Sequence, residues 1–213
     1  MLFDFATISA RERYKLLVST IVPRPIAWVV SQDRNGKLNA APFSFFNAVA
    51  GDPPVVAVGI GSHGSGRPKE TEKDTRQNIQ ATGEFVVNLV SEETAEKMNV
   101  TAIEFESGVD ELAEAGLHTA PSLHVRPPRI VESPVSMECK LIQIVELGPE
   151  AGLVLGRVVA MHVRDESVAD AAKHYIDTPS LKLIGRMHGR GWYARTSDLF
   201  EMDRIPLEKW RAQ

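Results

Sequence analysis

Apolar and polar residues alternate along the later part of the chain with the two-residue period of a half-buried strand. In VSMECKLIQIVEL, the apolar positions Met137, Cys139 and Leu141 alternate with Ser136, Glu138 and Lys140. Side chains of a strand point to opposite faces in turn, so this segment is predicted to have one wet face. Runs rich in strand-forming residues also lie at 26–32, 38–49, 55–60, 83–90 and 152–166. The pattern predicts five or six antiparallel strands.

Short helices and tight turns are predicted between these strands. Ser9 followed by Glu12 forms a capping box before RERYKLLVS, and Ser91 with acidic neighbours opens a helix in SEETAEKMNVTA. The pair Asn35-Gly36 is typical of a hairpin turn. Gly156 lies inside the last strand, where it indicates a bulge or bend of the kind that closed barrels need. Together these signals favour a small antiparallel barrel over alternating β-α-β units.

The segment at 105–133 is rich in proline, glycine, histidine and charged residues. Within it, only VDELAEAG has a pattern that predicts a helical turn or two. We predict that it is mostly a surface excursion of the single domain. Segments of this kind often carry function or cover a partner.

The run PPVVAVGIGSHGSGRPKETEKDTRQNI contains G-x-G-x-x-G at Gly59, Gly61 and Gly64, directly after a predicted strand. A dinucleotide-binding fingerprint requires an apolar helix that opens at the third glycine. Here the residues after Gly64 stay polar until Ile79, so that interpretation fails. The run predicts instead a polar loop that ends at the cap Asp74-Thr75, with a short helix from Thr75 to Ala81.

This loop carries the groups that a phosphate needs. Arg67, Lys69 and Lys73 converge on the start of a helix that carries Thr75, where backbone N–H groups and the helix dipole favour an anion. The alternative is a solvated surface loop before an ordinary capped helix, and these residues alone leave both interpretations open.

Composition and charge indicate a single domain and argue against several classes of protein. A chain of 213 residues with 43% hydrophobic residues fits one substantial domain. The single Cys139 excludes an internal disulfide framework, and the N-terminus lacks the pattern of a secretory leader, so we expect a reducing cytoplasm. The net charge of −4 and the pI near 5.9 argue against nucleic acid as a main partner, and the short apolar runs predict no membrane helix.

Several stretches together carry a family resemblance. They are TIVPRPIAWVVS, NAAPFSFFNAV, PPVV, KDTRQNI, GEFVVNLV and LIGRMHGRGWY, in this order along most of the chain. The combination resembles the flavin reductase-like, FMN-binding split-barrel family, and its flavoredoxin branch most of all. The resemblance implies a mainly β, six-stranded antiparallel split barrel of the Greek-key type with short peripheral helices. It also implies a homodimer that binds FMN non-covalently near the subunit interface.

The resemblance also implies roles for individual residues. Ser62, Lys73 and Thr75 would hold the flavin phosphate, Asp74 would orient the loop, and Ser44 would add a hydroxyl group. Backbone groups of Phe43, Ser44, Phe45, Phe46 and Asn47 would reach the isoalloxazine ring, with Arg24 nearby. Gly185 and Arg186 match a late family stretch that is expected near the flavin, from the same subunit or its partner.

Each of these residues also has a simpler interpretation. Phe43 and Phe45 can be core residues, Arg24 can be a solvated residue in a rigid turn between prolines, and His188 can be a surface histidine. The six histidines show no pattern typical of a zinc site. Cys139 is expected to be a buried, inert thiol.

In a flavin enzyme the cofactor carries the redox chemistry, so no catalytic acid or base is assigned. The expected activity is an NADH- or NADPH-dependent flavin reductase that passes electrons to free flavin, a partner oxygenase or another acceptor. The alternatives are a flavoenzyme that acts directly on a small organic substrate, an electron-transfer protein with little nicotinamide turnover, and a flavin-free structural module. The residues do not discriminate NADH from NADPH, and residues 105–133 are expected to set the choice of acceptor.

Overall fold

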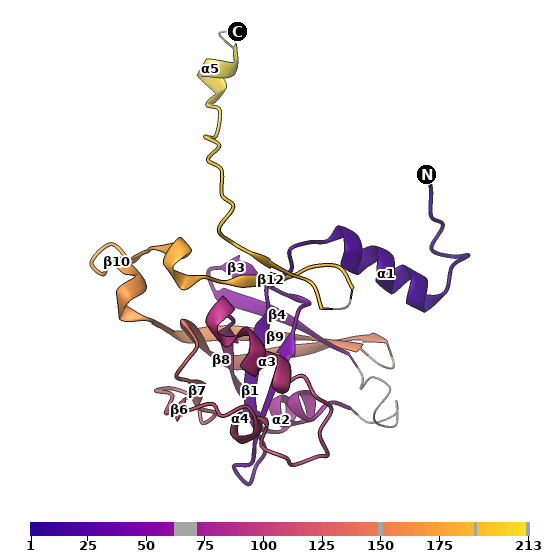
Figure 1. Ribbon diagram of the computed structural model, residues 1–213, viewed down its shortest axis with the longest axis vertical. Coiled ribbons are helices and arrows are strands. Elements are labelled where there is room, and N and C mark those ends of the chain that lie inside the picture. Colours follow the sequence, from indigo (N-terminus) through magenta and orange to yellow (C-terminus); the bar gives the residue numbers. More distant parts are fainter. Residues whose placement is uncertain (62–71, 149–150, 190, 212–213) are drawn as a thin grey trace.

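Seven antiparallel strands form the main sheet, in the spatial order β2-β1-β5-β8-β9-β4-β3 (Figure 1). The computed structural model describes residues 1–61, 72–148, 151–189 and 191–211. The strands are β1 (Ala27–Gln32), β2 (Leu38–Phe43), β3 (Phe46–Gly51), β4 (Pro54–Gly61), β5 (Glu84–Leu89), β8 (Val135–Gly148) and β9 (Ala151–Val163). All six neighbouring pairs are antiparallel, which confirms a mainly β protein with few helices.

The two edge strands of this sheet are consecutive in the chain. β2 ends at Phe43 and β3 begins at Phe46, so only Ser44 and Phe45 lie between the two edges. Such a link spans roughly 10 Å, so the sheet curls until its edges come together here. The sequence predicts a single strand over 38–49, which is wrong. The segment divides at Ser44, and this division accounts for seven strands where the family resemblance implies six.

Strand β1 is buried on both faces and separates two apolar clusters. Trp28 and Val30 belong to one cluster, whereas Ala27 and Val29 belong to the other, as the alternation of a strand requires. The indole nitrogen of Trp28 donates a hydrogen bond of 2.9 Å to the hydroxyl of Thr101. The core therefore lies on both sides of the sheet.

The predicted caps and turns are present. Helix α1 (Ala10–Thr20) begins with the Ser9–Glu12 capping box, and Ser91 begins η1 (Glu92–Thr94), which continues into α3 (Ala95–Val100). Helix α2 (Asp74–Thr82) starts one residue earlier than predicted, with Lys73 as its N-cap. The hairpin between β1 and β2 turns at residues 33–37, where Gly36 has a φ of 88°. Two further helices are α4 (Glu111–Glu114) and α5 (Leu207–Arg211).

Gly156 lies in β9 where Phe85 packs closely against the backbone. A Cβ atom at this position would lie 2.4 Å from the Phe85 ring and 3.4 Å from the Cβ of Cys139. The partner strand β8 has a register irregularity opposite, between Leu141 and Gln143. The extra residue of this irregularity is Ile142 of β8, so the bulge lies in the partner strand opposite Gly156 and not in β9 at the glycine itself.

Residues 105–133 are more than a surface excursion. Four of their side chains, Leu112, Leu117, Val125 and Ile130, are buried in the same cluster as Trp28. Their spacing follows neither a helix nor a strand period, because most of the segment is irregular apart from α4 and the pair β6 (Thr119–Ala120) and β7 (Arg129–Ile130). The segment therefore covers one face of the sheet, which corrects the prediction.

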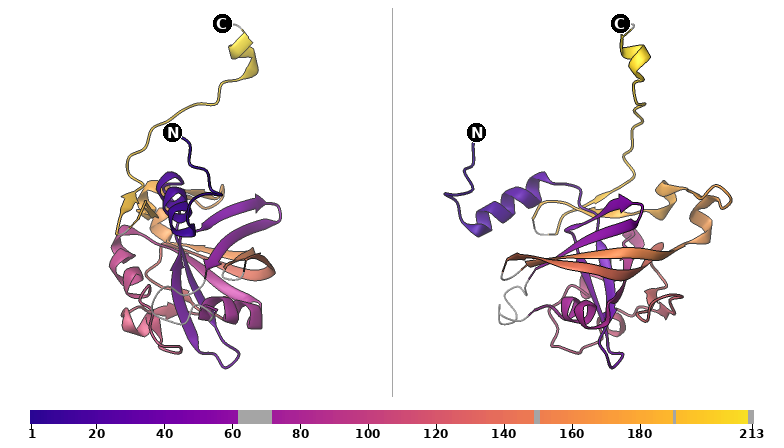
Figure 2. Two further views of the ribbon diagram at one scale, coloured as in Figure 1. Left: turned by 90° about the vertical axis from the view of Figure 1, so that its right-hand side faces the viewer. Right: turned by 180° about the vertical axis from the view of Figure 1, so that it is seen from behind.

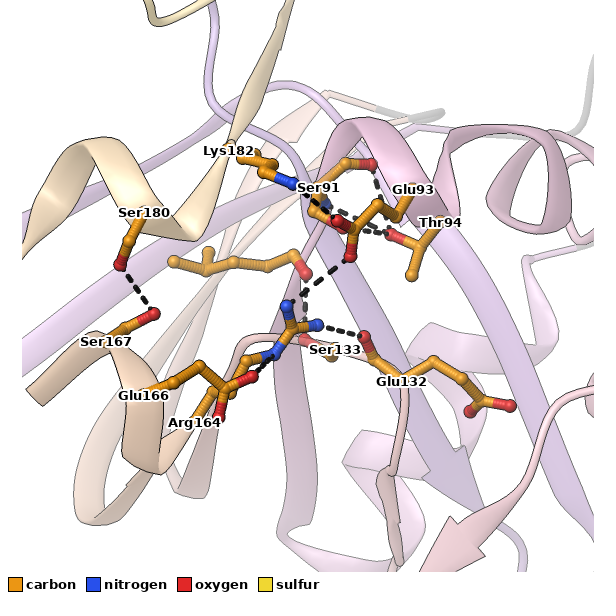
Figure 3. A network of polar contacts seen from close by, with 11 residues as sticks. Ser91, Glu93, Thr94, Glu132, Ser133, Arg164, Glu166, Ser167, Ser180 and Lys182 are labelled. Carbon is orange, nitrogen blue, oxygen red and sulfur yellow. Dashed lines mark hydrogen bonds and ion pairs between the residues drawn. The ribbon is translucent and has the colours of Figure 1, made fainter.

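A polar network centred on Arg164 attaches the following segment to the body (Figure 3). The guanidinium lies 3.4 Å from carboxylate oxygens of both Glu93 and Glu166 and donates to the backbone oxygen of Glu132. Lys182 reaches Glu93 at 2.8 Å. This segment contains η2 (Asp165–Ser167), β10 (Val168–Asp170), β11 (Tyr175–Ile176) and η3 (Thr178–Leu181), and it leads into the hairpin of β12 (Ile184–Arg186) and β13 (Tyr193–Arg195).

The chain after Thr196 leaves the body as an extended arm (Figures 1 and 2). We call residues 197–211 the C-terminal arm. Helix α1 lies at the same end of the molecule, and the hairpin between β1 and β2 lies at the opposite end. Within the described residues, none of the helices is long and apolar enough to cross a membrane.

Candidate functional site

The start of helix α2 lies against the end of strand β2. The ammonium group of Lys73 lies 5.6 Å from the centre of the Phe43 ring, on the face of the ring. Phe43 itself is buried, with 7% of its surface exposed. Its side chain is therefore a core residue, which is the simpler of the two interpretations given above. The two stretches KDTRQNI and APFSFFN, separate in the sequence, therefore meet at one place.

Behind this contact lies a buried chain of hydrogen bonds. Thr75 donates its hydroxyl to Asn39 Oδ1 at 2.6 Å, and Asn39 Nδ2 donates to Glu111 Oε1 at 2.8 Å. The other oxygen of Glu111 accepts from the backbone N–H of Ala40 at 3.0 Å. Burial raises the pKa of Glu111 although these hydrogen bonds oppose the shift. Because the Thr75 hydroxyl has one proton and gives it to Asn39, it faces a ligand only as an acceptor in this arrangement.

A polar cavity of about 100 Å³ opens at the same point. Asn39, Lys73, Asp74 and Thr75 line one side of it, and residues 101–105 line the other. Asp74 also accepts a hydrogen bond of 3.4 Å from Ser107. Asn39 and Glu111 are members of this site that the sequence did not reveal, because they come from segments 72 positions apart.

The link between β2 and β3 presents an exposed aromatic ring. Phe45 is 48% exposed, which contradicts its interpretation as a core residue, and it contacts Tyr14 edge to face at 6.2 Å. Its backbone oxygen accepts from the N–H of Gly59 at 2.7 Å. A Cβ atom at Gly59 would lie 2.9 Å from the Cβ of Phe45. The glycine thus allows two backbones to approach, a packing role and not that of a nucleotide fingerprint.

The next two residues, Phe46 and Asn47, begin the edge strand β3. An edge strand pairs on one side only, so alternate backbone N–H and C=O groups point away from the sheet. Phe46 is half-buried, and the side chain of Asn47 accepts a hydrogen bond from the N–H of Ala48 at 2.9 Å. Backbone polar groups are therefore available at this edge.

Arg24 is buried, with 6% of its surface exposed, so its interpretation as a solvated turn residue is wrong. Its guanidinium donates to the carbonyl oxygens of Val18 at 2.7 Å and Met187 at 3.0 Å, and its Nε reaches the Ser44 hydroxyl at 3.5 Å. Burial lowers the pKa of Arg24, and Arg186 nearby adds to the effect. One side chain thus connects the end of α1, the link between the edge strands and the late motif.

The late motif lies beside Arg24. The backbones of Arg24 and Arg186 exchange two hydrogen bonds, of 2.9 and 2.8 Å. Gly185 packs on Pro23, and a Cβ atom there would lie 2.7 Å from the Cβ of Pro23. The guanidinium of Arg186 stacks over the Tyr193 ring at 4.7 Å. His188 is exposed beside the Trp192 ring at 5.6 Å, which agrees with a surface histidine.

A second hollow, of about 340 Å³, lies beside the late motif and is almost entirely apolar. We call it the apolar groove. Pro25, Phe46, Leu89, Met137 and Ile184 are among the residues that line it, and Thr196 lies at its rim where the C-terminal arm begins. Its lining residues Pro25 and Ile26 lead into β1, and Leu89 ends β5. Helix α1 and the arm emerge at one end of the body (Figures 1 and 2).

Some predicted groups stay untested or have other roles. Ser62, Gly64, Arg67 and Lys69 fall outside the described residues. Cys139 is buried, and burial raises the pKa of its thiol to about 12, as expected of an inert cysteine. Where the chain is described, no cluster of three or more histidine, cysteine or acidic side chains could hold a metal ion.

The chain is similar to several known proteins. The model of the flavin reductase like domain matches residues 18–179. The structure is similar to nitrilotriacetate monooxygenase component B from Bacillus cereus, with 33% identity, a TM-score of 0.87 and coverage of 95% of this chain and 98% of that one. It is similar to 2-nitrobenzoate 2-nitroreductase from Pseudomonas fluorescens, with 31% identity, a TM-score of 0.86 and 97% of both chains covered. Flavoredoxin from Desulfovibrio vulgaris shares the fold at 19% identity, with a TM-score of 0.74 over 95% and 97% of the two chains.

Proposed function

The chain belongs to the flavin reductase-like domain family, and on that basis we propose that it is an FMN-binding oxidoreductase, an NADH- or NADPH-dependent flavin reductase. Electrons would pass from the nicotinamide to free flavin, a partner oxygenase or another acceptor. Bound flavin supplies the redox chemistry, taking up an electron pair as hydride and releasing it to the acceptor. The protein supplies binding, orientation and access.

The observation that carries this proposal is the contact between Lys73 and Phe43. It brings a cation and the N-terminus of a nine-residue helix to the edge of the sheet that carries residues 43–47. A flavin mononucleotide has a dianionic phosphate at one end and a flat ring with hydrogen-bonding atoms at the other. The two halves of the site match these two ends.

The phosphate end is assigned to Lys73 and to the first-turn N–H groups of α2, and the family resemblance adds Ser62. A lysine is a compact point charge, and a helix N-terminus presents N–H groups and a positive dipole to an anion. The polar cavity has carboxylates of Asp74, Glu104 and Glu111 in its lining and therefore suits hydroxyl groups better than phosphate. We assign it to the sugar-alcohol chain between phosphate and ring.

The ring end is assigned to the backbone of residues 43–47. The edge position of β3 leaves N–H and C=O groups for the polar rim of the ring, and Ser44 adds a hydroxyl held by Arg24. Gly185 and Arg186 complete this side through their pairing with Arg24. We further propose a homodimer with the flavin near the subunit interface, working in the reducing cytoplasm.

A second candidate, direct reduction of a small organic substrate on the bound flavin, is favoured by one finding. The nitroreductase from Pseudomonas fluorescens is 31% identical over nearly the whole chain. The similarity to a monooxygenase component supports the first candidate and, with it, a partner oxygenase as acceptor.

The absorption spectrum of the purified protein tests the proposal. We expect a yellow protein that releases FMN on denaturation, identified by mass, and that loses its colour when NADH or NADPH is added without air. Steady-state oxidation of the nicotinamide with added free FMN then separates a reductase from a carrier with little turnover, and oxidation only with an added nitroaromatic compound favours the second candidate. A colourless protein that does not bind added FMN contradicts the proposal.

A further inference from the structure

The C-terminal arm exposes a series of large apolar side chains. Leu199, Phe200, Met202, Ile205, Leu207 and Trp210 are 57–84% exposed. The hydrogen bond that Trp210 N–H donates to the oxygen of Pro206 is local to the arm. Water penalises apolar surface of this extent, and contiguous exposed patches usually mark an interaction site.

The apolar groove offers an apolar surface that matches the exposed side chains of the arm. Its volume of about 340 Å³ is enough for several side chains, and its lining offers hydrocarbon from Pro25, Phe46, Leu89, Met137 and Ile184. Charged residues are absent from that lining among the described residues. Extended peptides that carry apolar anchors bind grooves of this kind.

The arm begins at the rim of the groove but points away from it. Thr196 lines the groove, and its hydroxyl donates to the oxygen of Leu183 at 2.9 Å, so the root of the arm is fixed. From there the chain continues outward (Figures 1 and 2). To enter the groove of its own copy, the chain would have to reverse directly after Thr196, whereas residues 197–206 run outward from the body.

The groove of a second copy can receive the arm without a reversal of the chain. With the arm and the groove side by side at one end of the molecule, a two-fold axis there delivers each arm to the groove of the other copy. If each of the six side chains buries on the order of 100 Å², two arms cover roughly 1,200 Å², which a stable interface requires. We propose that two copies of this chain exchange their C-terminal arms, and that Phe200 and Met202 of each enter the apolar groove of the other.

This inference rests on the proposed function only for the pairing of two copies, and it adds which segment and which surface form the pair. Photo-crosslinking tests it directly in the full-length protein. A photoreactive phenylalanine analogue replaces Phe200, and the protein is refolded from an equal mixture of isotopically light and heavy copies. We expect crosslinks between light and heavy peptides that contain Pro25, Leu89 or Ile184.

Crosslinks that join only peptides of the same isotope overturn the proposal, as do crosslinks confined to surfaces away from the groove. Equal photolysis of a variant labelled at the exposed Leu123, 75% exposed and outside the arm, gives the background of random contacts.

The mass in solution gives the second measurement. Phe200→Ser combined with Met202→Ser is expected to shift the protein from twice its 23.4 kDa chain mass towards the single chain, by light scattering at micromolar concentration. Leu123→Ser is the matched control and leaves the mass unchanged. A dimer that keeps its full affinity without these two side chains overturns the exchange but leaves the flavin proposal intact, and FMN binding of the same samples, read from the absorption spectrum, tests that proposal separately.

Discussion

Thr75 and Asn39 share a hydrogen bond of 2.6 Å in the protein interior, and it orients the first turn of helix α2 toward the end of strand β2. Because the Asn39 amide is held in turn by Glu111, residues from three separate segments fix the position of the neighbouring Lys73. A binding group held in this way loses little conformational freedom when a ligand arrives. The predictions below start from this arrangement.

Replacing the Lys73 ammonium is expected to weaken FMN binding without unfolding the protein. A hydrogen bond to a charged group contributes about 1.5–3 kcal/mol, which corresponds to a loss of roughly 10- to 100-fold in affinity for Lys73→Met. Quenching of FMN fluorescence on titration measures it. Lys140→Met, at an exposed position of β8, is the control. Equal affinity of the two variants would show that the phosphate lies elsewhere.

Glu111 is expected to make stability depend on pH in a defined direction. Its pKa in the folded protein lies above its ordinary value of 4.5 because burial disfavours the charged carboxylate. The folded state therefore holds the proton more tightly, and stability falls as the pH rises from 4.5 through the higher folded pKa. In Glu111→Gln this fall should be absent. Urea unfolding between pH 4 and pH 8 measures the slope, with Glu114→Gln from the same helix as the exposed control.

Glu138 is expected to act in the opposite direction. Burial raises its pKa, but hydrogen bonds from His162 at 2.7 Å and from the N–H groups of Leu123 and His124 outweigh burial, so the pKa lies below its ordinary value of 4.5. This contribution to stability is complete above pH 4.5 and is lost as the pH falls through the folded pKa. Glu138→Ala should cost about 1–3 kcal/mol at neutral pH, since it leaves buried donors unpaired.

Limited proteolysis gives an additional readout for Glu138. Cleavage within residues 105–133 should accelerate in the variant, because this carboxylate holds Leu123 and His124 against β8. Unchanged cleavage at those sites would show that the buried apolar residues alone hold the segment in place.

A methyl group at Gly156 is expected to destabilise the core of the main sheet. Its Cβ would lie 2.4 Å from the Phe85 ring, which is fully buried. Overpacking of this kind costs about 1–3 kcal/mol. The urea midpoint of Gly156→Ala measures the loss, and Gly51→Ala, with open space around its Cβ, is the control. Similar midpoints would mean that β9 shifts to accept the methyl group.

The sequence predicts the local features of this fold well. The Ser9–Glu12 capping box and the Asn35-Gly36 turn are each specified by residues close together, and both are confirmed. The wet face predicted for β8 is wrong at Ser136 and Glu138, which are buried, because residues 105–133 fold onto this part of the strand. The division of 38–49 into two strands was not predictable, because no glycine marks it and both halves have strand-forming residues. Only the curl of the whole sheet requires the break at Ser44.

In the candidate site, too, the sequence predicts residues within compact motifs and misses contacts between distant segments. The sequence identified Lys73 and residues 43–47, since they belong to compact motifs. It did not identify the role of Arg24, because the partners of its guanidinium are backbone oxygens, and every residue has one. The sequence did not identify Asn39 and Glu111 either, because their contact depends on how residues 105–133 fold back onto the sheet.

The positions of the two chain ends matter for anyone who handles this protein. The N-terminal helix and the C-terminal arm leave the body at the same end (Figure 2), and the groove residues Pro23 and Thr196 lie next to them in the chain. An affinity tag or fluorescent protein fused to either end would therefore crowd the groove. The turn at Asn35-Gly36 lies at the far end of β1 and β2 and is exposed, so a label inserted there keeps the groove side clear.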